Sequence, residues 1–257
     1  MKKYLTLLLL YCITAHAQKA SPKMDGVYTM TKQMVNNGVT DQVIPTKQLK
    51  MYNGRYVMYA AAISPTDSLA SFGIGTYHVK NGKVIENFFY TAAGGALIDT
   101  AILTIEQSPK GYKQVIVYPP MMDTIYTLTE EYDKVDKSMV SAIDGAWKLN
   151  TSYMIAPAGD TVINKVTQYK MYRGGHFIWS AGYVDSATAK NQGVFGFGTF
   201  TLKGSKLTEK NTQSTYTSQL VGIPVVLDIA FKGKNEYTQT ISWPDGTKGV
   251  ETYTRLE

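Results

Sequence analysis

The strongest constraint on the fold is an internal repeat that runs through the chain after its first residues. Asp25-Gly26-Val27-Tyr28 returns 119 residues later as Asp144-Gly145-Ala146-Trp147. Two further segments, Gln48–Tyr52 and Phe72–Tyr77, return in the same order. Their counterparts are Gln168-Tyr169-Lys170-Met171-Tyr172 and Phe195-Gly196-Phe197-Gly198-Thr199-Phe200. Two copies of about 110 residues are too few and too long for a solenoid, in which units of ~20–50 residues stack at least in threes. The sequence therefore predicts two tandem domains.

The domain boundaries follow from the repeat and from the composition between its copies. A charged stretch without aromatic residues separates the copies and leads directly into the second Asp-Gly. We therefore place the first domain at 18–132, the linker at 133–143 and the second domain at 144–257. Because the linker is short, we expect the two domains to contact each other.

The first residues form a pattern that is typical of a secretory signal peptide. Lys2 and Lys3 precede an apolar run over 4–13, and the small-x-small triplet Ala15-His16-Ala17 follows. The run is too short to span a bilayer of ~30 Å. We expect cleavage after Ala17 and a secreted or periplasmic protein.

Removal of residues 1–17 changes both the charge and the cysteine content. Lipid attachment at Cys12, the alternative to cleavage, is disfavoured by the bulky Tyr11 before it; cleavage removes this single cysteine. The loss of Lys2 and Lys3 from 26 basic residues leaves 24 against 20 acidic ones, a formal charge of +4. This weak balance, without a basic run, argues against a nucleic-acid partner. The chain after residue 13 has no apolar stretch long enough for a transmembrane segment.

The hydrophobic pattern within each copy alternates with a period of two. Segments such as 114–118 and 236–241 are rich in β-branched and aromatic residues, and turns such as Asn53-Gly54 and Lys203-Gly204 separate such segments. Short strands joined by these hairpins predict an antiparallel meander. With about eight strands per copy, closure into a barrel removes every sheet edge. The predicted fold class is all-β, with two tandem antiparallel up-and-down β-barrels.

Gly145-Ala146-Trp147 resembles the Gly-x-Trp pattern that opens the first strand of lipocalins and their calycin relatives. These families place an arginine from the last strand over the tryptophan ring, and Arg255 stands at that position. The resemblance implies that Trp147 and Arg255 close the second barrel as a structural contact. In the first copy Tyr28 replaces Trp147. Alignment of Tyr126 with Tyr253 puts Leu128 in place of Arg255, so we expect this closure to be missing there.

The repeated Phe-Gly-x-Gly-Thr-[Tyr/Phe] pattern, followed by a hairpin and by Glu86 or Glu209, extends the resemblance to both copies. It is similar to the lipocalin-like domains of uncharacterised secreted Bacteroidetes proteins, over about 25–132 and 144–257. The resemblance implies that both barrels are lipocalin-like. The two glycines of the motif lie on one face of a strand, which permits sharp curvature or close approach by an aromatic ring.

Glu86 and Glu209 are the ionisable residues most suited to a binding site. Alternation puts Glu86 on one strand face with Phe88 and Tyr90. If this face points inward, the carboxylate stands on a cavity wall, where a polar group can orient a ligand. The alternative is a carboxylate that faces solvent and pairs with a lysine. The candidate ligand-binding residues are Glu86, Phe88, Tyr90, Phe177, Trp179 and Glu209.

The sequence offers little for catalysis or for a bound metal. After residue 17 the only histidines are His78 and His176, which do not correspond in the repeat, and no His-x-His or cysteine cluster exists. No Gly-x-Ser-x-Gly elbow is present. The Gly-x-Gly motifs fall inside strands, so a dinucleotide site is not expected. We expect no enzyme activity, no metal and no cofactor.

Two functional hypotheses follow from the repeat and from the 19 tyrosines. The first is an exported, non-enzymatic binding protein that holds a small, largely apolar ligand in a barrel cavity. The second is a structural or interaction module whose barrels are filled and whose surface tyrosines bind a glycan or a protein. A hydrolase or isomerase that uses Glu86 or Glu209 as an acid or base is a third hypothesis. The identity of the ligand, the functional half and the oligomeric state stay open.

Overall fold

The structure is a computed structural model that describes residues 21–62, 71–96, 100–120, 125–136, 139–184, 191–216 and 218–257. The predicted signal peptide at 1–17, with Cys12, lies outside the described residues. No helix in the described ranges is both long and apolar enough to cross a membrane.

The first half of the chain folds into one antiparallel sheet that closes on itself. Neighbouring strands are joined in sequence order from β3 to β9, and β1 pairs with both β3 and β9, so that the sheet forms a ring. A short β2 extends the sheet along the second half of β1. The strands in order are β1 (Gly26–Asn36), β2 (Asp41–Val43), β3 (Lys47–Asn53), β4 (Tyr56–Ala62), β5 (Ser71–Lys80), β6 (Lys83–Thr91), β7 (Ala101–Gln107), β8 (Gly111–Val117) and β9 (Thr127–Lys134).

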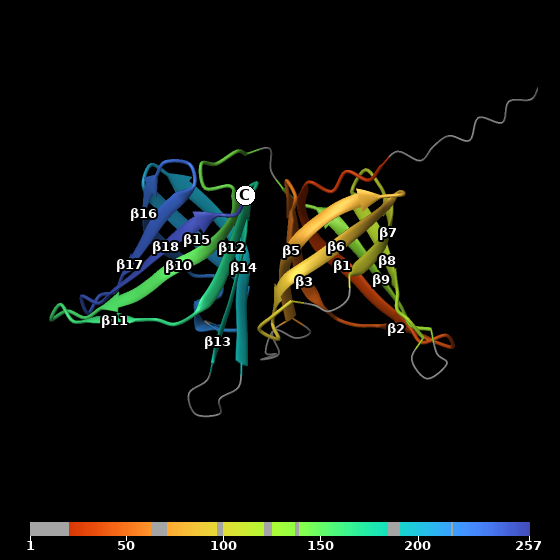
Figure 1. Cartoon of the computed structure of the whole chain (residues 1–257), viewed down its shortest axis with the longest axis horizontal. Coiled ribbons are helices and arrows are strands. Elements are labelled where there is room, and N and C mark those ends of the chain that lie inside the picture. The colour runs from red at the N-terminus through yellow and green to blue at the C-terminus, as the bar shows by residue number, and fades with distance from the viewer. Residues whose placement is uncertain are drawn as a thin grey trace, which may run out of the picture.

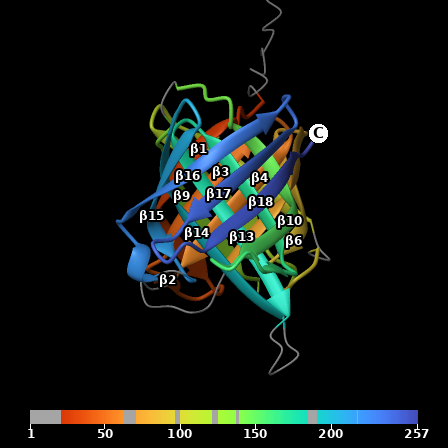
Figure 2. The same cartoon turned by 90° about the vertical axis from the view of Figure 1, so that its left-hand side faces the viewer.

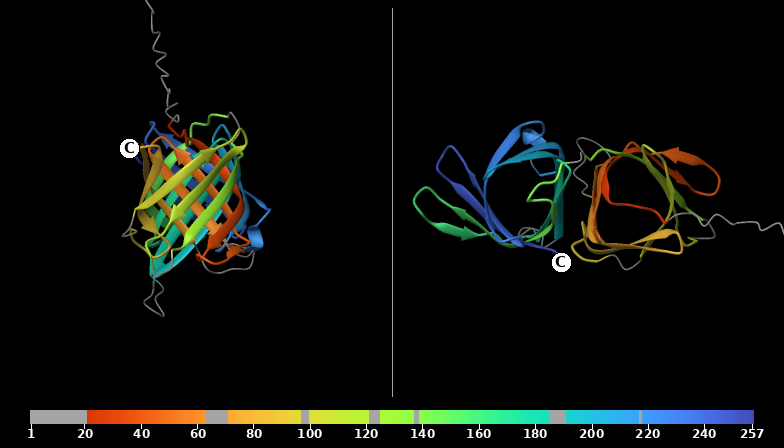
Figure 3. Two further views of the ribbon diagram at one scale, coloured as in Figure 1. Left: turned by 90° about the vertical axis from the view of Figure 1, so that its right-hand side faces the viewer. Right: turned by 90° about the horizontal axis from the view of Figure 1, so that it is seen from above.

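The second half repeats this topology strand for strand. β10 pairs with β12 and β18 and closes the second ring, while β11 pairs with the end of β10 as β2 does with β1. The elements are β10 (Gly145–Ile155), β11 (Thr161–Ile163), β12 (Thr167–Arg173), β13 (His176–Val184), β14 (Asn191–Lys203), β15 (Lys206–Ser214), the short 3-10 helix η1 (Ser218–Leu220), β16 (Pro224–Lys232), β17 (Glu236–Ser242) and β18 (Lys248–Arg255). Figure 3 shows both rings end-on.

The strand pairing confirms the predicted fold class of two tandem antiparallel eight-stranded β-barrels. β9 continues to Lys134, two residues past the predicted end of the first domain, and β10 begins at Gly145. Two-residue turns join β3 to β4, β5 to β6, β12 to β13 and β14 to β15, as in an up-and-down meander.

The glycines of the Phe-Gly-x-Gly motif allow the close approaches that the sequence predicts. A Cβ atom on Gly73 would lie 2.7 Å from the Tyr59 ring, and one on Gly196 would lie 2.4 Å from Trp179 Nε1. Gly75 follows a register shift in the pairing of β5 with β6, and its Cβ would lie 2.1 Å from the Asn87 carbonyl oxygen. Such a bulge bends a strand and increases its twist, which helps a sheet to close.

The two barrels pack side by side through their outer surfaces (Figure 1), so that the second barrel lies in front of the first in Figure 2. β3 and β4 of the first barrel contact β12, β13 and β14 of the second. A single apolar cluster crosses this junction, with members such as Met51 and Met58 from one side and Met171 and Ile178 from the other. The strands at the junction are therefore buried on both faces, and β4 reads as the nearly continuous apolar run YVMYAAA.

Polar contacts surround the apolar junction. Arg173 of the second barrel donates to Asn53 Oδ1 at 2.9 Å, and its guanidinium lies 3.7 Å from Asp25 and 3.8 Å from Asp136. The Arg55 guanidinium donates a hydrogen bond to the main-chain carbonyl oxygen of Glu257. These contacts fix one barrel against the other across the linker.

Candidate functional site

The interior of the first barrel contains a buried ion pair. Alternation along β3 turns Gln48, Lys50 and Tyr52 inward, while the intervening residues face the second barrel. Lys50 Nζ lies 2.8 Å from Glu86 Oε1, and both side chains are almost fully buried. The Tyr52 hydroxyl donates to the same carboxylate oxygen at 2.5 Å. Glu86 therefore points into the barrel and has both a cationic and a neutral partner.

A second carboxylate extends this network toward one end of the barrel. Gln114 accepts a hydrogen bond from Lys50 Nζ at 3.3 Å and donates to Glu130 Oε2 at 2.5 Å. The Tyr132 hydroxyl also donates to Glu130 Oε2, at 2.8 Å, and accepts a hydrogen bond from Gln48 at 2.6 Å. The network thus joins β3, β6, β8 and β9 across the barrel interior.

The second barrel contains the same network. Lys170 Nζ lies 3.2 Å from Glu209 Oε1, and the Tyr172 hydroxyl donates to that oxygen at 2.5 Å. Gln239 accepts from Lys170 at 3.1 Å and donates to Glu251 Oε2 at 2.7 Å. The Tyr253 hydroxyl donates to Glu251 Oε2 at 2.6 Å and accepts from Gln168.

Each network residue has an identical counterpart in the other barrel, although neighbouring positions differ. Tyr59, for example, corresponds to Trp179, and Phe88 corresponds to Asn211. The matched network pairs are Gln48 and Gln168, Lys50 and Lys170, Tyr52 and Tyr172, Glu86 and Glu209, Tyr112 and Tyr237, Gln114 and Gln239, Glu130 and Glu251, and Tyr132 and Tyr253. The polar interior is therefore preserved residue for residue between the two copies.

The buried tyrosines respond electrostatically to these carboxylates. Burial raises the pKa of Tyr52 well above its usual value, and the negative charge of Glu86 raises it further. The hydroxyls of Tyr112 and Tyr237 are buried and interact with the hydroxyls of Tyr52 and Tyr172, respectively. The same tyrosine pair therefore recurs at the same place in both barrels.

Two of the predicted binding residues, Glu86 and Glu209, are brought into equivalent interior positions but in separate barrels. Phe88 is also buried in the first barrel, where its ring meets Tyr59 edge to face at 5.2 Å. Tyr90 instead belongs to the apolar cluster at the junction and contacts Tyr169, with ring centroids 5.3 Å apart. Of the three residues predicted to share one face, Glu86 and Phe88 thus lie inside the first barrel, whereas Tyr90 lies at the junction.

Phe177 and Trp179 face the interior of the second barrel, as their shared parity predicts. Phe177 is fully buried and stacks on Tyr172 at 6.2 Å. Trp179 is partly buried and meets Tyr216 edge to face at 6.5 Å. Their role in ligand binding stays a prediction.

The predicted contact between Trp147 and Arg255 is present. The Arg255 guanidinium lies 4.1 Å from the Trp147 ring centroid, and Trp147 Nε1 donates to the carbonyl oxygen of Ile143 at 2.8 Å. In the first barrel a lysine takes the place of the guanidinium, so the contact between an indole and an arginine is missing there, as expected. Tyr28 pairs with Lys134, and Lys134 Nζ lies 6.0 Å from the Tyr28 ring centroid.

The predicted alignment of the last strand, which put Leu128 in place of Arg255, is wrong. In the structure Tyr132, not Tyr126, occupies the position of Tyr253, because both pair with the equivalent residues of the neighbouring strand. Lys134 is therefore the counterpart of Arg255, while Leu128 corresponds to Gly249.

Sequence reasoning missed the lysines at the centre of both networks. The signal was present in the repeat itself, because Gln, Lys and Tyr of Gln48–Tyr52 recur unchanged in Gln168–Tyr172 and alternate along the strand. Residues that alternate share one face of a strand. Together with the carboxylate of Glu86, a lysine on that face indicates a buried pair rather than a solvated one.

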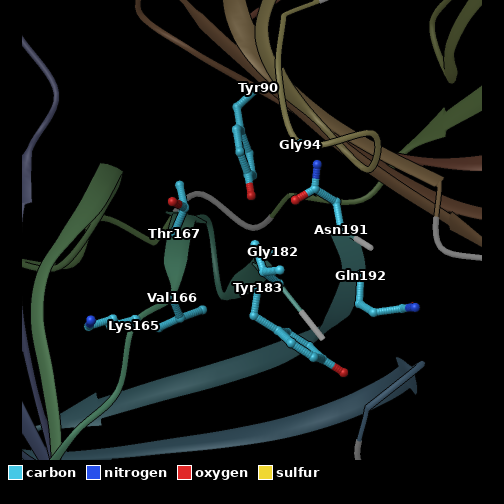
Figure 4. A pocket seen from close by; sticks show the side chains of 10 residues that line it. Tyr90, Gly94, Lys165, Val166, Thr167, Gly182, Tyr183, Asn191 and Gln192 are labelled. Carbon is cyan, nitrogen blue, oxygen red and sulfur yellow. The ribbon is translucent and has the colours of Figure 1, made fainter. Parts of the chain in front are cut away.

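A cleft of about 410 Å³ lies at the junction of the two barrels and is open to solvent. Most of its lining comes from the rim of the second barrel, and Tyr90 and Gly94 come from the first. In Figure 4 the Tyr90 hydroxyl points toward Gly182, with Thr167 and Asn191 on either side. The lining residues are Tyr90, Gly94, Lys165, Val166, Thr167, Gly182, Tyr183, Val184, Asn191 and Gln192.

The chemistry of the cleft differs from that of the barrel interiors. Hydroxyl and amide groups dominate its lining, Lys165 supplies one positive charge, and no carboxylate is among the lining residues described. Burial raises the pKa of Tyr90, whose hydroxyl also forms a hydrogen bond with Thr167. In the described ranges no three metal-binding side chains gather in one place.

Comparisons with known proteins give fold-level likenesses at most. The sequence matches no family model and no curated protein. A redesigned β-barrel is 17% identical and covers 45% of this chain and 93% of its own, with a TM-score of 0.29. A DUF3598-family protein of unknown function from Nostoc punctiforme is 11% identical and covers 90% of this chain and 96% of its own, with a TM-score of 0.26. At these scores the barrel assignment rests on the strand pairing alone.

Proposed function

We propose that this chain is an exported, non-enzymatic binding protein of lipocalin-like type that holds a small, hydroxyl-rich ligand of the saccharide kind between its barrels. The observation that carries the proposal is the cleft of about 410 Å³, a volume within the ~300–1,000 Å³ of small-molecule sites. The barrels are the rigid supports, and the ligand contacts come from the rim.

The lining of the cleft favours a neutral or weakly anionic saccharide. The hydroxyls of Tyr90, Thr167 and Tyr183 and the amides of Asn191 and Gln192 can both donate and accept hydrogen bonds. Sugar hydroxyls require this dual capacity. The tyrosine rings also offer apolar faces beside their polar ends. The absence of a lining carboxylate among the described residues disfavours a cationic ligand in this cleft.

The barrel interiors support the hypothesis of filled barrels over that of an apolar cavity. Large side chains such as Trp147, Tyr172 and Tyr237 are fully buried, and charged networks occupy the space between them. The buried tyrosine hydroxyls are the polar groups available to an interior ligand, and the experiment described next compares the cleft with the barrel interiors.

The deciding experiment is methyl NMR of the full chain with leucine and valine labelled. A panel of maltose, lactose and chitobiose should include a sugar that shifts the methyl signals of Val166 and Val184 saturably, because both residues line the cleft. The signals of Leu103 and Leu207, which are fully buried in the two barrels, should not move. Decanoate tests the alternative of an apolar ligand inside a barrel. If it binds there, it would shift the methyl signals of Leu103 and Leu207.

A matched pair of variants assigns the site. Asn191→Ala should weaken sugar binding by at least tenfold, because it removes an amide that lines the cleft. Asn235→Ala, in the hairpin between β16 and β17 outside the cleft lining, should leave binding unchanged. Equal effects of the two substitutions, or shifts confined to Leu103 and Leu207, would overturn the proposal.

A further inference from the structure

The two barrels differ where the network reaches its second carboxylate. In the first barrel Gln33 Nε2 donates to Glu130 Oε1 at 2.7 Å, and Thr46 donates to Gln33 Oε1 at 2.6 Å. Gln33 at Oε1, together with Tyr132 and Gln114 at Oε2, thus surrounds the carboxylate with donors. Glu130 is accordingly only 5% exposed. Side chains of the protein itself cap this group.

The cap is missing from the second barrel. Ser152 pairs with Glu251 across β10 and β18 as Gln33 pairs with Glu130, and the shorter serine accepts a hydrogen bond from Asn164 instead. In the described part of the chain, Glu251 receives its hydrogen bonds from Gln239 and Tyr253, both at Oε2. Glu251 is only half-buried. One side of its carboxylate thus remains accessible.

A second substitution changes the same region. Gly249 of the second barrel stands where the first barrel has Leu128, two residues before the carboxylate on the last strand. The Trp243 ring lies over this glycine, 2.9 Å from where a Cβ would be. Successive residues on one face of a strand are about 7 Å apart. The indole therefore lies about one side-chain spacing from Glu251.

The charges of the second network leave Glu251 without a cation. Lys170 is paired with Glu209 at 3.2 Å, and no described lysine or arginine forms an ion pair with Glu251. The nearby Tyr237 hydroxyl is fully buried, and the charge of Glu251 contributes to raising its pKa. A carboxylate partly removed from water is costly without a cationic partner.

We infer that Glu251 anchors a small organic ammonium ion at the end of the second barrel, with Trp243 contacting its alkyl chain, and that Gln33 and Leu128 deny this site to the first barrel. A carboxylate beside an indole suits an alkylammonium, because the aromatic face attracts cations and accepts apolar groups. The half-buried side chain of Ile241, which packs on the barrel core and contacts the same glycine, adds apolar surface.

The test uses n-butylammonium chloride as the probe and the three indole N–H signals of the full chain as reporters. The Trp243 signal should shift saturably, whereas that of Trp147, whose N–H donates to Ile143, should stay in place and confirm the fold. n-Butanol, which lacks the charge, should bind at least tenfold more weakly. The inference would be overturned if both probes shifted the Trp243 signal equally, or if n-butylammonium caused no saturable shift of that signal.

Variants distinguish an anchor from a general charge effect. Glu251→Gln should weaken n-butylammonium binding by at least tenfold, and Glu130→Gln, its counterpart in the first barrel, should change it less than twofold. Ser152→Gln should also weaken binding at least tenfold, because it installs the cap of the first barrel without a change of charge. Unaltered binding in Glu251→Gln or Ser152→Gln, with the Trp147 signal retained, would contradict the site.

Discussion

Lys50 shows at the scale of one residue how the barrel interiors tolerate charge. Lys50 is 3% exposed, and its ammonium group lies 2.8 Å from the carboxylate of Glu86. Removal of one member of a buried pair leaves the other charge without compensation, which costs about 3–5 kcal/mol. An exposed pair such as Lys206 with Asp228 contributes at most about 1 kcal/mol, because water screens it.

We therefore predict that Lys50→Met lowers the free energy of unfolding by about 3–5 kcal/mol, measured by urea denaturation. Lys206→Met, the exposed control, should lower it by less than about 1 kcal/mol. The double variant Lys50→Met with Glu86→Leu should recover most of the lost stability, since it removes both charges. If Lys50→Met lowers the free energy of unfolding as little as Lys206→Met does, Glu86 is not held as a buried ion.

At the same scale, the sequence allowed one half of each ion pair to be predicted. Alternation along the strand singled out Glu86 and Glu209 as candidates for an inward face. Whether that face points inward depends on which side of the sheet closes, and period two alone does not specify the side. The capping difference at Glu251 depends on contacts between residues about 100 positions apart, which no local pattern encodes.

At the scale of the element, glycines in β5 and β14 allow close contact with the neighbouring strands. Gly75 stands opposite a bulge in β6, and a methyl group there would meet the backbone of that strand rather than a movable side chain. The alternating pattern predicted these strands and the role of their glycines. It could not predict that β4 and β13 are buried on both faces, because the second face is covered by the other barrel.

Gly75→Ala should consequently destabilise the protein by about 1–3 kcal/mol, because the backbone must shift to admit the methyl group. Gly95→Ala is the matched control, since nothing lies within 4 Å of its added Cβ and its backbone is not in the left-handed region. It should change the free energy of unfolding by less than about 0.5 kcal/mol. Thermal and urea unfolding of both variants measure the difference, and equal effects would refute the steric explanation.

At the scale of the whole molecule, the tyrosine content couples stability to alkaline pH. Burial is the main cause that raises the pKa of six interior tyrosines well above the usual value. They are Tyr52, Tyr112, Tyr132, Tyr172, Tyr237 and Tyr253. The same cause raises the pKa of Tyr28 and Tyr77 to about 12. The unfolded chain releases these protons near pH 10.

The sign of the pH effect follows from this difference. Above pH ~10 the folded protein keeps phenolic protons that the unfolded chain has lost, so the free energy of unfolding decreases as pH rises. The stabilisation is fully present below pH ~10. Urea titrations between pH 8 and 12 should show this decline, and absorbance at 295 nm should show six tyrosines that ionise only on unfolding. Constant stability through pH 11 would contradict the burial of these phenols.

The arrangement of the two barrels also predicts how one would behave alone. Each presents the same face to the other, since β3 corresponds to β12 and β4 to β13, and these equivalent strands meet across the junction. The apolar residues on that face include Tyr169, Met171 and Ile178. Without the first barrel they would be exposed together, and a patch of this kind associates with a complementary surface. The nearest complement is the same face of a second copy, related by a two-fold axis.

The second barrel produced alone as residues 139–257 should therefore form a dimer, measured by sedimentation velocity. Ile178→Asp should make it monomeric, because it places a charge in the centre of the apolar contact. Val226→Asp, at a position already 54% exposed on another strand, should leave the dimer intact. A folded barrel that stays monomeric without substitution would mean that the junction depends on the polar contacts of Arg173 and the linker. In that case the duplicated apolar face would contribute to orientation rather than to affinity.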